Sequence, residues 1–127
     1  MRAGDAAADL SSAIDTTISA GGRELIPSGF AVAIPEGCAG LVLSRSGLAL
    51  HHGVAVLNAP GLVDSGYRGE IGVILINHGA EPVAIERGQR IAQLMVVDAP
   101  AFTLGLVSEL PDGPDDRGAA GFGSSGA

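Results

Sequence analysis

The sequence has 127 residues, the length of one domain, and it is 46% hydrophobic, although aromatic residues supply only 3%. Fourteen acidic residues stand against seven arginines and no lysine, a net charge of −7, which argues against partners such as nucleic acid or anionic membrane surfaces. No apolar run approaches the ~20 residues of a membrane span, the first residues lack a signal-peptide pattern, and the single cysteine, Cys38, excludes an internal disulfide, so we expect a cytoplasmic protein.

Short apolar runs rich in Val and Ile recur between residues 23 and 99, and Gly, Pro, Asn or Asp bounds each of them. This spacing predicts an all-β sandwich or barrel rather than alternating helices and strands. The run at 73–76 does not alternate polar with apolar residues, so we expect both of its faces to be covered, one of them by another subunit. The predicted strands are residues 29–34, 39–44, 53–58, 70–77, 81–86 and 91–97.

One short helix is predicted over residues 46–51, and Gly53 is expected to close it. The strand pattern ends at Asp98, so we divide the chain into a β core over residues 1–98 and a C-terminal arm over residues 99–127. The arm is rich in glycine and cannot pack a core of its own, so we expect it to be mobile when no ligand is bound. At ~3.3 Å per residue, the stretch from Asp98 to Arg117 can span about 60 Å and reach a neighbouring subunit.

Residues 44–47, Ser-Arg-Ser-Gly, stand where a strand ends and the short helix begins. The free N–H groups of a helix start, the Ser46 hydroxyl and the Arg45 guanidinium together suit a phosphate. A plain helix cap with Arg45 in a surface ion pair explains the same residues, and on this motif alone it is the simpler interpretation.

Residues 58–70 are predicted to form a long hairpin between two strands. Asn58 offers a donor and an acceptor to a base-like ligand. Asp64 follows an apolar pair, where a carboxylate can act as a general base toward water, and Tyr67, the only tyrosine, can stack on a sugar or base. An ordinary tight connection accounts for the same residues and is favoured by this segment taken alone.

Two further segments carry polar residues in distinctive settings. Gln93 is the polar exception on a strand, where it can bond a phosphate or a metal-bound water, or simply face solvent. In the glycine-rich segment 117–126, Arg117 can meet phosphate charge and Phe122 can close over a ligand, although a flexible terminus remains the alternative. The segment is not a Walker A loop, because its Gly-Lys-Ser/Thr ending is missing. The three histidines lack metal-ligand spacing and are expected at the surface.

Five segments, taken in order, resemble the motifs of the trimeric dUTPase family (deoxyuridine 5′-triphosphate nucleotidohydrolases) over residues 3–126. They are AGDAAADL (3–10), SRSGLA (44–49), NAPGLVDSGYRGE (58–70), RGQRIAQL (87–94) and RGAAGFGSSG (117–126). The third and fifth are the specific ones. The resemblance overturns the simpler interpretations given above.

The resemblance implies a jelly-roll-like β subunit with one short helix, assembled as a homotrimer whose active sites lie between subunits. It implies hydrolysis of dUTP to dUMP and pyrophosphate with Mg²⁺, which limits uracil in DNA and supplies dUMP for dTMP synthesis. By motif position, Asp64 would orient the attacking water and Arg117 would act as an arginine finger. Tyr67 would stack under the deoxyribose and leave no room for a 2′-hydroxyl.

The remaining positions follow from the same resemblance. Uracil would be read at Asn58 and at the hairpin near Leu62, Val63 and Gly72. Asp9 would lie near the water shell of the metal. Phosphates would be held at Arg45, Ser46, Gly47 and Gln93, and the arm would close over the nucleotide with Phe122, Gly123, Ser124 and Ser125.

The chain departs from the family pattern at three positions. Ser44 stands where many members have proline, so a looser entry to the phosphate-binding turn is expected. Gln89 replaces an acidic residue, and Ala120 replaces a glycine of the arm.

Two other functions compete with this interpretation. A dCTP deaminase, including its bifunctional dCTP deaminase/dUTPase form, shares the fold, but the short chain and the hairpin from Asp64 to Tyr67 favour the diphosphatase. A non-catalytic nucleotide sensor is the second alternative, and no residue pattern favours it.

Overall fold

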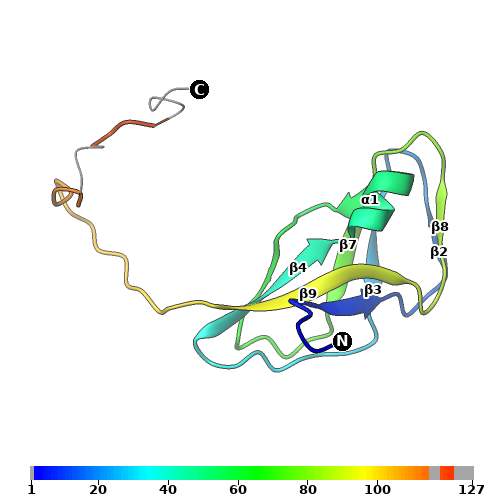
Figure 1. The fold of residues 1–127 in the computed structure, drawn as a ribbon, viewed down its shortest axis with the longest axis horizontal. Helices are drawn as coiled ribbons and strands as arrows, with labels where there is room; N and C mark the ends of the chain where they lie inside the picture. Colours follow the sequence, from blue (N-terminus) through cyan, green and yellow to red (C-terminus); the bar gives the residue numbers. More distant parts are fainter. Residues whose placement is uncertain (1, 115–117, 122–127) are drawn as a thin grey trace.

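The structure is a computed structural model and describes residues 2–114 and 118–121. This part of the chain is built almost entirely from short β-strands and contains one short helix (Figure 1). In chain order the elements are β1 (Ala8–Ser11), β2 (Thr16–Ile18), β3 (Arg23–Pro27), β4 (Cys38–Ser44), α1 (Ser46–His52), β5 (Val54–Val56), β6 (Gly61–Val63), β7 (Gly72–Asn77), β8 (Val83–Ile85) and β9 (Arg90–Asp98).

The strands form two main antiparallel sheets and a separate pair. The larger sheet has the order β1-β9-β4-β6, the smaller has the order β3-β7-β5, and β2 pairs with β8. The longest pairing joins β4 to β9, from Cys38 opposite Asp98 to Ser44 opposite Ala92. The β9 strand therefore lies between the N-terminal strand β1 and the strand that leads into α1.

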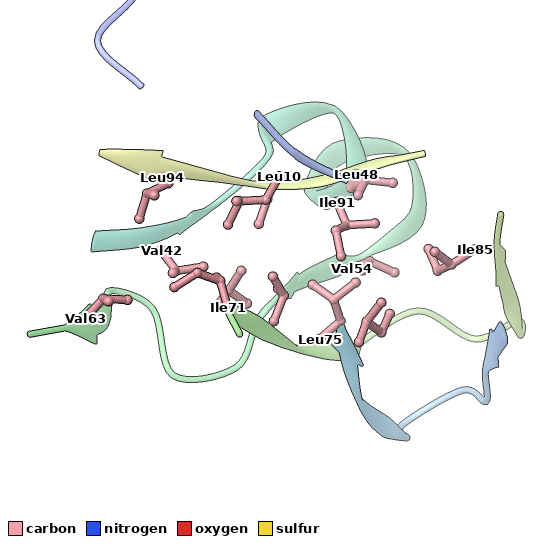
Figure 2. Packing of buried hydrophobic residues seen from close by; sticks show 14 of the residues in the cluster. Leu10, Val42, Leu48, Val54, Val63, Ile71, Leu75, Ile85, Ile91 and Leu94 are labelled. Atoms are coloured by element: carbon pink, nitrogen blue, oxygen red, sulfur yellow. The ribbon is translucent and has the colours of Figure 1, made fainter. Parts of the chain in front are cut away.

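The hydrophobic core lies between the two main sheets, and Figure 2 shows side chains from both sheets converging on it. Alternate residues of β7, Val73 and Leu75, are almost fully buried, as are Ile91 and Leu94 of β9. Burying one such aliphatic side chain stabilises a fold by about 1.5–3 kcal/mol relative to exposure. The core is therefore built from Val, Ile and Leu side chains, as expected for a sequence with few aromatic residues.

The helix α1 starts at the predicted residue, Ser46, and runs one residue further than predicted, to His52. It contributes one buried residue, Leu48, and it ends at Gly53, which has a positive φ of 67°. The Gly53 N–H donates to the carbonyls of Ala49 and Leu48. A Cβ at this position would lie 2.9 Å from the backbone nitrogen of Gly79. Both the left-handed backbone and this close approach require glycine.

The prediction of a mostly-β chain with one short helix is confirmed, and five of the six predicted strands overlap an observed strand. The sixth, residues 29–34, is wrong, because this segment forms no strand. The Ile71 N–H, just before β7, donates to the Phe30 carbonyl, and the Ile71 carbonyl accepts from the Ser28 N–H. Ile34 is nevertheless buried in the core. The apolar pattern of this segment therefore reflects burial of side chains and not hydrogen bonding to a neighbouring strand. The short strands β1, β2, β3 and β6 were not predicted.

Beyond β9 the chain leaves the sandwich (Figure 1). Residues 101–114 contain neither helix nor strand, and their side chains are exposed. Among residues 2–114 and 118–121, no helix is long and apolar enough to cross a membrane. The division of the chain at residue 98 stays a prediction.

Candidate active site

Two neighbouring hollows lie along the segment that connects β5 to β7. Their volumes are about 190 Å³ and about 260 Å³. Five residues line both of them, and these are Leu62, Val63, Tyr67, Glu70 and Gly72. The two hollows are therefore adjacent parts of one concave surface, which we call the hairpin site.

Asp64 lies at the rim of the hairpin site, directly after β6. Pairing of β6 with β4 sets Gly40 opposite Val63, which is buried, and the next residue leaves the sheet toward solvent. The backbone carbonyl of Asp64 accepts a hydrogen bond of 3.1 Å from the Tyr67 N–H and so forms a turn. Within the described part of the chain, no hydrogen bond engages the Asp64 carboxylate, which is exposed and available to orient a water molecule.

The Tyr67 ring forms part of the wall of both hollows. Its side chain is 46% exposed, and its hydroxyl donates a hydrogen bond of 2.9 Å to the backbone carbonyl of Glu70. The Arg68 guanidinium donates to the carbonyls of Ser65, at 2.7 Å, and of Tyr67, at 2.9 Å. These bonds fix the turn that carries the ring.

Asn58 borders the larger hollow, together with Val42 and Val56 of the core. Its amide can both donate and accept, as the polar edge of a heterocyclic base requires. The opposite wall includes Leu25 of β3 beside Gly72. The structure therefore brings together six of the predicted site residues, which are Asn58, Leu62, Val63, Asp64, Tyr67 and Gly72.

A second, polar pocket of about 620 Å³ lies where β1, β9 and the end of β4 meet, and we call it the arginine pocket. Three predicted residues line it, Asp9, Arg45 and Gln93. Asp9 and Gln93 are paired across β1 and β9, which sets both on one row of the sheet. The other residues that line this pocket are Arg2, Asp5, Ala6, Ala7 and Arg90.

Arg45 is the residue that connects the arginine pocket to the start of α1. Its backbone is extended, with φ −94° and ψ 126°, and its side chain does not cap the helix. Its Nε lies 3.6 Å from the Asp9 carboxylate, and its Nη1 donates a 3.1 Å hydrogen bond to the Arg90 carbonyl. The Nε atom is buried and has no hydrogen-bond partner in the structure. The ion pair of the simpler interpretation is thus present, whereas the helix cap is not.

Not every predicted residue lies in one of these places. Ser46 and Gly47 are exposed at the first turn of α1 and line neither pocket, and the hairpin site and the arginine pocket share no lining residue. Five predicted residues of the arm, Arg117, Phe122, Gly123, Ser124 and Ser125, lie outside the described residues.

Several residues that line these surfaces were not predicted from the sequence, among them Glu70, Leu25 and Arg90. Glu70 and Leu25 line the hairpin site, and Arg90 lines the arginine pocket with its Nη1 3.3 Å from the Asp9 carboxylate. Glu70 and Arg90 lie within the third and fourth motifs, and this position could have indicated that they belong to the site. Leu25 had none, because it reaches the site only through the pairing of β3 with β7.

Ser44, where the departure from the family pattern led us to expect a looser entry to the turn after β4, makes a hydrogen bond at this point of the chain. Its Oγ accepts a 2.8 Å hydrogen bond from the Val56 N–H. This bond ties the end of β4 to β5, the strand that precedes Asn58.

The donor set of the arginine pocket is compatible with a magnesium ion that is carried mainly by phosphates. Among the described residues there is no cluster of three His, Cys, Asp or Glu side chains that could hold a metal alone. Mg²⁺ in nucleotide sites usually keeps several waters and takes one or two carboxylates plus phosphate oxygens. Two carboxylates, those of Asp5 and Asp9, line this pocket.

A model of the dUTPase family matches residues 1–126 of this chain. The chain belongs to the dUTPase family. The resemblance inferred from the five motifs is therefore confirmed. Two similar bacterial proteins are both named deoxyuridine 5′-triphosphate nucleotidohydrolase. The one from Anaeromyxobacter sp. (strain Fw109-5) is 50% identical over 97% of this chain and 82% of its own length, and the one from Beijerinckia indica is 52% identical over 98% and 79%.

Solved structures of phage dUTPases are similar to this dUTPase family member in fold. A variant of the Staphylococcus bacteriophage 80alpha dUTPase with dUpNHpp has a TM-score of 0.90 and 28% identity, over 100% of this chain and 89% of that one. A variant of the dUTPase from phage phi11 of S. aureus, described with a structural Mg(II) ion, has a TM-score of 0.76 and 27% identity, over 83% and 84%.

Proposed function

We propose that this protein hydrolyses dUTP to dUMP and pyrophosphate. Water adds to the α-phosphorus, the bond from that phosphorus to the oxygen bridging the α- and β-phosphates breaks, and pyrophosphate leaves. Membership of the dUTPase family supports the proposal, as do relatives of about 50% identity that bear the nucleotidohydrolase name. The reaction would limit uracil in DNA and supply dUMP for dTMP synthesis.

The observation that carries the proposal is the position of Asp64. Its carboxylate stands at the rim of a hollow that Tyr67 also lines. No side chain or backbone group of the described residues makes a hydrogen bond to this carboxylate. In this role the carboxylate accepts a proton from the water as the oxygen approaches phosphorus. Phosphoryl transfer asks little more of a protein than such positioning and the neutralisation of charge.

The hairpin site would hold the deoxyuridine. The open face of the Tyr67 ring suits stacking against the sugar, and Asn58 suits the polar edge of uracil. Leu62 and Val63 supply apolar wall and backbone groups beside it. Gly72 lines the same hollow, where its backbone would contact the base.

The phosphates would be held by Arg45, Ser46, Gly47 and Gln93. The arginine pocket and the hairpin site share no lining residue within one chain, which supports an active site assembled from different subunits of a homotrimer. The arm, whose residues 101–114 are exposed and leave the sandwich, would extend to such a site. There Arg117 would meet the developing charge, and Phe122, Gly123, Ser124 and Ser125 would close over the nucleotide.

Magnesium bound to the triphosphate would neutralise charge on the phosphates. On this chain Asp9, with its carboxylate in the arginine pocket, would contact the waters of the ion. Asp9 also pairs with Arg45 and Arg90, so it orients the guanidinium groups beside the phosphates.

The deciding experiment measures pyrophosphate release from dUTP, UTP, dTTP and dCTP in parallel with Mg²⁺, together with ammonia release from dCTP. We expect pyrophosphate from dUTP and little from the other three. Ammonia from dCTP would instead indicate a deaminase, an alternative that the family match and the names of the relatives do not favour. Tight binding of dUTP without any pyrophosphate would indicate a sensor.

A further inference from the structure

The Tyr67 ring rests against Gly69, and only a residue without a side chain leaves room for it. A Cβ built on Gly69 would lie 2.5 Å from Oη, 2.7 Å from Cζ and 3.1 Å from Cε2 of Tyr67. The backbone itself makes no such demand, because Gly69 is not in the left-handed region. It is therefore the position of the tyrosine ring, and not the backbone conformation, that disfavours a side chain here.

The hydroxyl end of the ring is anchored on a peptide that is itself held in place. Tyr67 Oη donates to the Glu70 carbonyl at 2.9 Å, and Glu70 Oε1 accepts from the Gly29 N–H at 2.7 Å. The next residue, Ile71, exchanges two further backbone bonds of 3.0 Å with residues 28 and 30. The carbonyl that receives the phenol is thus fixed against a separate segment of the chain.

One face of the Tyr67 ring therefore packs against Gly69, and the other faces the hollows. The side chain keeps 46% of its surface exposed and lines both parts of the hairpin site. A ring that can withdraw would admit a bulkier sugar, whereas a ring pinned by its hydroxyl and backed by the chain cannot withdraw. The position of the ring relative to the hollows is therefore set by its contacts with Gly69 and with the Glu70 carbonyl.

We infer that Gly69 and Glu70 are positioning residues that fix the Tyr67 ring and thereby set the preference for deoxyribose over ribose. The inference rests on the proposed function and deepens it. Gly69 acts by leaving room behind the ring. Glu70 acts through its backbone carbonyl, which receives the phenol, and through its carboxylate, which holds that carbonyl in place.

The main test compares Gly69→Ala with Gly66→Ala, a matched control in the same turn, where an added Cβ meets nothing within 4 Å. The clash at Gly69 is with the end of a side chain, so the ring should yield and the fold should survive. We expect the ratio of kcat/KM for dUTP over UTP to fall by about tenfold or more in Gly69→Ala, and to stay within about threefold of wild type in Gly66→Ala.

A second measurement follows the ring without any turnover. The chain has one tyrosine and no tryptophan, so its tyrosine fluorescence reports Tyr67 alone. Quenching by acrylamide should increase in Gly69→Ala and remain at the wild-type level in Gly66→Ala. An unchanged dUTP/UTP ratio with unchanged quenching in a folded Gly69→Ala would overturn the inference.

Glu70 provides an independent pair of variants should Gly69→Ala not fold. Glu70→Ala removes the acceptor of the Gly29 N–H and should lower the dUTP/UTP ratio, whereas Glu70→Gln retains an acceptor oxygen and should restore most of it. A loss of activity toward both nucleotides in equal proportion would mean that Glu70 is merely structural and would count against the inference. Failure of the proposed function would appear separately, as a wild-type protein that releases no pyrophosphate from dUTP, and the inference would fall with it.

Discussion

The Nε atom of Arg45 lies 3.6 Å from a carboxylate oxygen of Asp9, an ion pair that joins the start of α1 to the N-terminal strand β1. Arg45 is only 24% exposed at its side chain, and the same Nε has no hydrogen-bond partner in the structure. Asp9 is therefore the anion that holds the Arg45 fork at the arginine pocket.

Replacing Asp9 by alanine should weaken nucleotide binding more than it weakens the fold. The Asp9 carboxylate is 39% exposed, and ion pairs that water reaches contribute about 1 kcal/mol or less to stability. Its loss would free the orientation of Arg45, which we propose holds phosphates. We expect the Kd of a non-hydrolysable dUTP analogue, measured by calorimetry, to rise by about tenfold, or about 1.4 kcal/mol. The control is Asp98→Asn, an exposed acidic residue at the end of β9. Equal affinities of Asp9→Ala and wild type would contradict the role given to this pair.

Replacing Asp64 by asparagine should abolish most turnover while leaving binding intact. The amide is similar in shape but cannot accept a proton from water, and general-base catalysis contributes about 10²–10⁴-fold. We expect kcat to fall within that range and the Kd of the analogue to stay within about threefold. Asp98→Asn again provides a matched change of charge. A near wild-type kcat in Asp64→Asn would reject this carboxylate as the base.

Ending the chain at Asp116, which removes Arg117 and the glycine-rich segment, should stop turnover without dissociating the proposed trimer. An arginine that meets transition-state charge accounts for about 10³–10⁵-fold in rate. Pyrophosphate release and light scattering measure the two effects. Arg117→Ala in the full chain separates the guanidinium from the rest of the segment. A shortened chain that becomes monomeric would show that the segment has a structural role.

Replacing Asn77 by alanine should destabilise the fold substantially. Asn77 is fully buried, and its amide donates to the carbonyls of Ile18 and Glu81 and accepts from the Gly79 N–H. Losing these partners inside the protein should lower the free energy of unfolding by about 2–4 kcal/mol. Urea denaturation measures the loss. His78→Ala, at the exposed neighbouring position, should have little effect, and a similar small effect of Asn77→Ala would contradict the prediction.

The parts of the structure that could be predicted from sequence are those set by local patterns. The helix start after Arg45 and its end at Gly53 depend on neighbouring residues, and both are confirmed. Most residues of the hairpin site lie within one stretch of the chain, from residue 58 to residue 74, so the sequence could predict that they lie close together. The segment 29–34 shows the limit, because burying Ile34 produces an apolar pattern without the pairing that defines a strand.

Contacts between segments that are distant in the sequence could not be predicted, because no local pattern indicates them. Arg90 and Asp9 are 81 residues apart in sequence and meet only because β1 pairs with β9. The pairing of Thr16–Ile18 with β8 is similarly distant and involves only three residues on each strand. Short strands of this kind offer too few residues for a periodic pattern, so their partners are chosen by the packing of the whole chain.

The small positive charge of the arginine pocket on an acidic protein has a consequence for how a nucleotide arrives. Three arginines and two aspartates of the described residues line this pocket, a net charge of +1, while the sequence as a whole carries a net charge of −7. A polyphosphate therefore meets repulsion at long range and attraction only within roughly a Debye length, about 8–10 Å in physiological salt. Moderate salt should thus accelerate the encounter, which is the reverse of the electrostatic steering seen when a basic surface attracts an anion from afar.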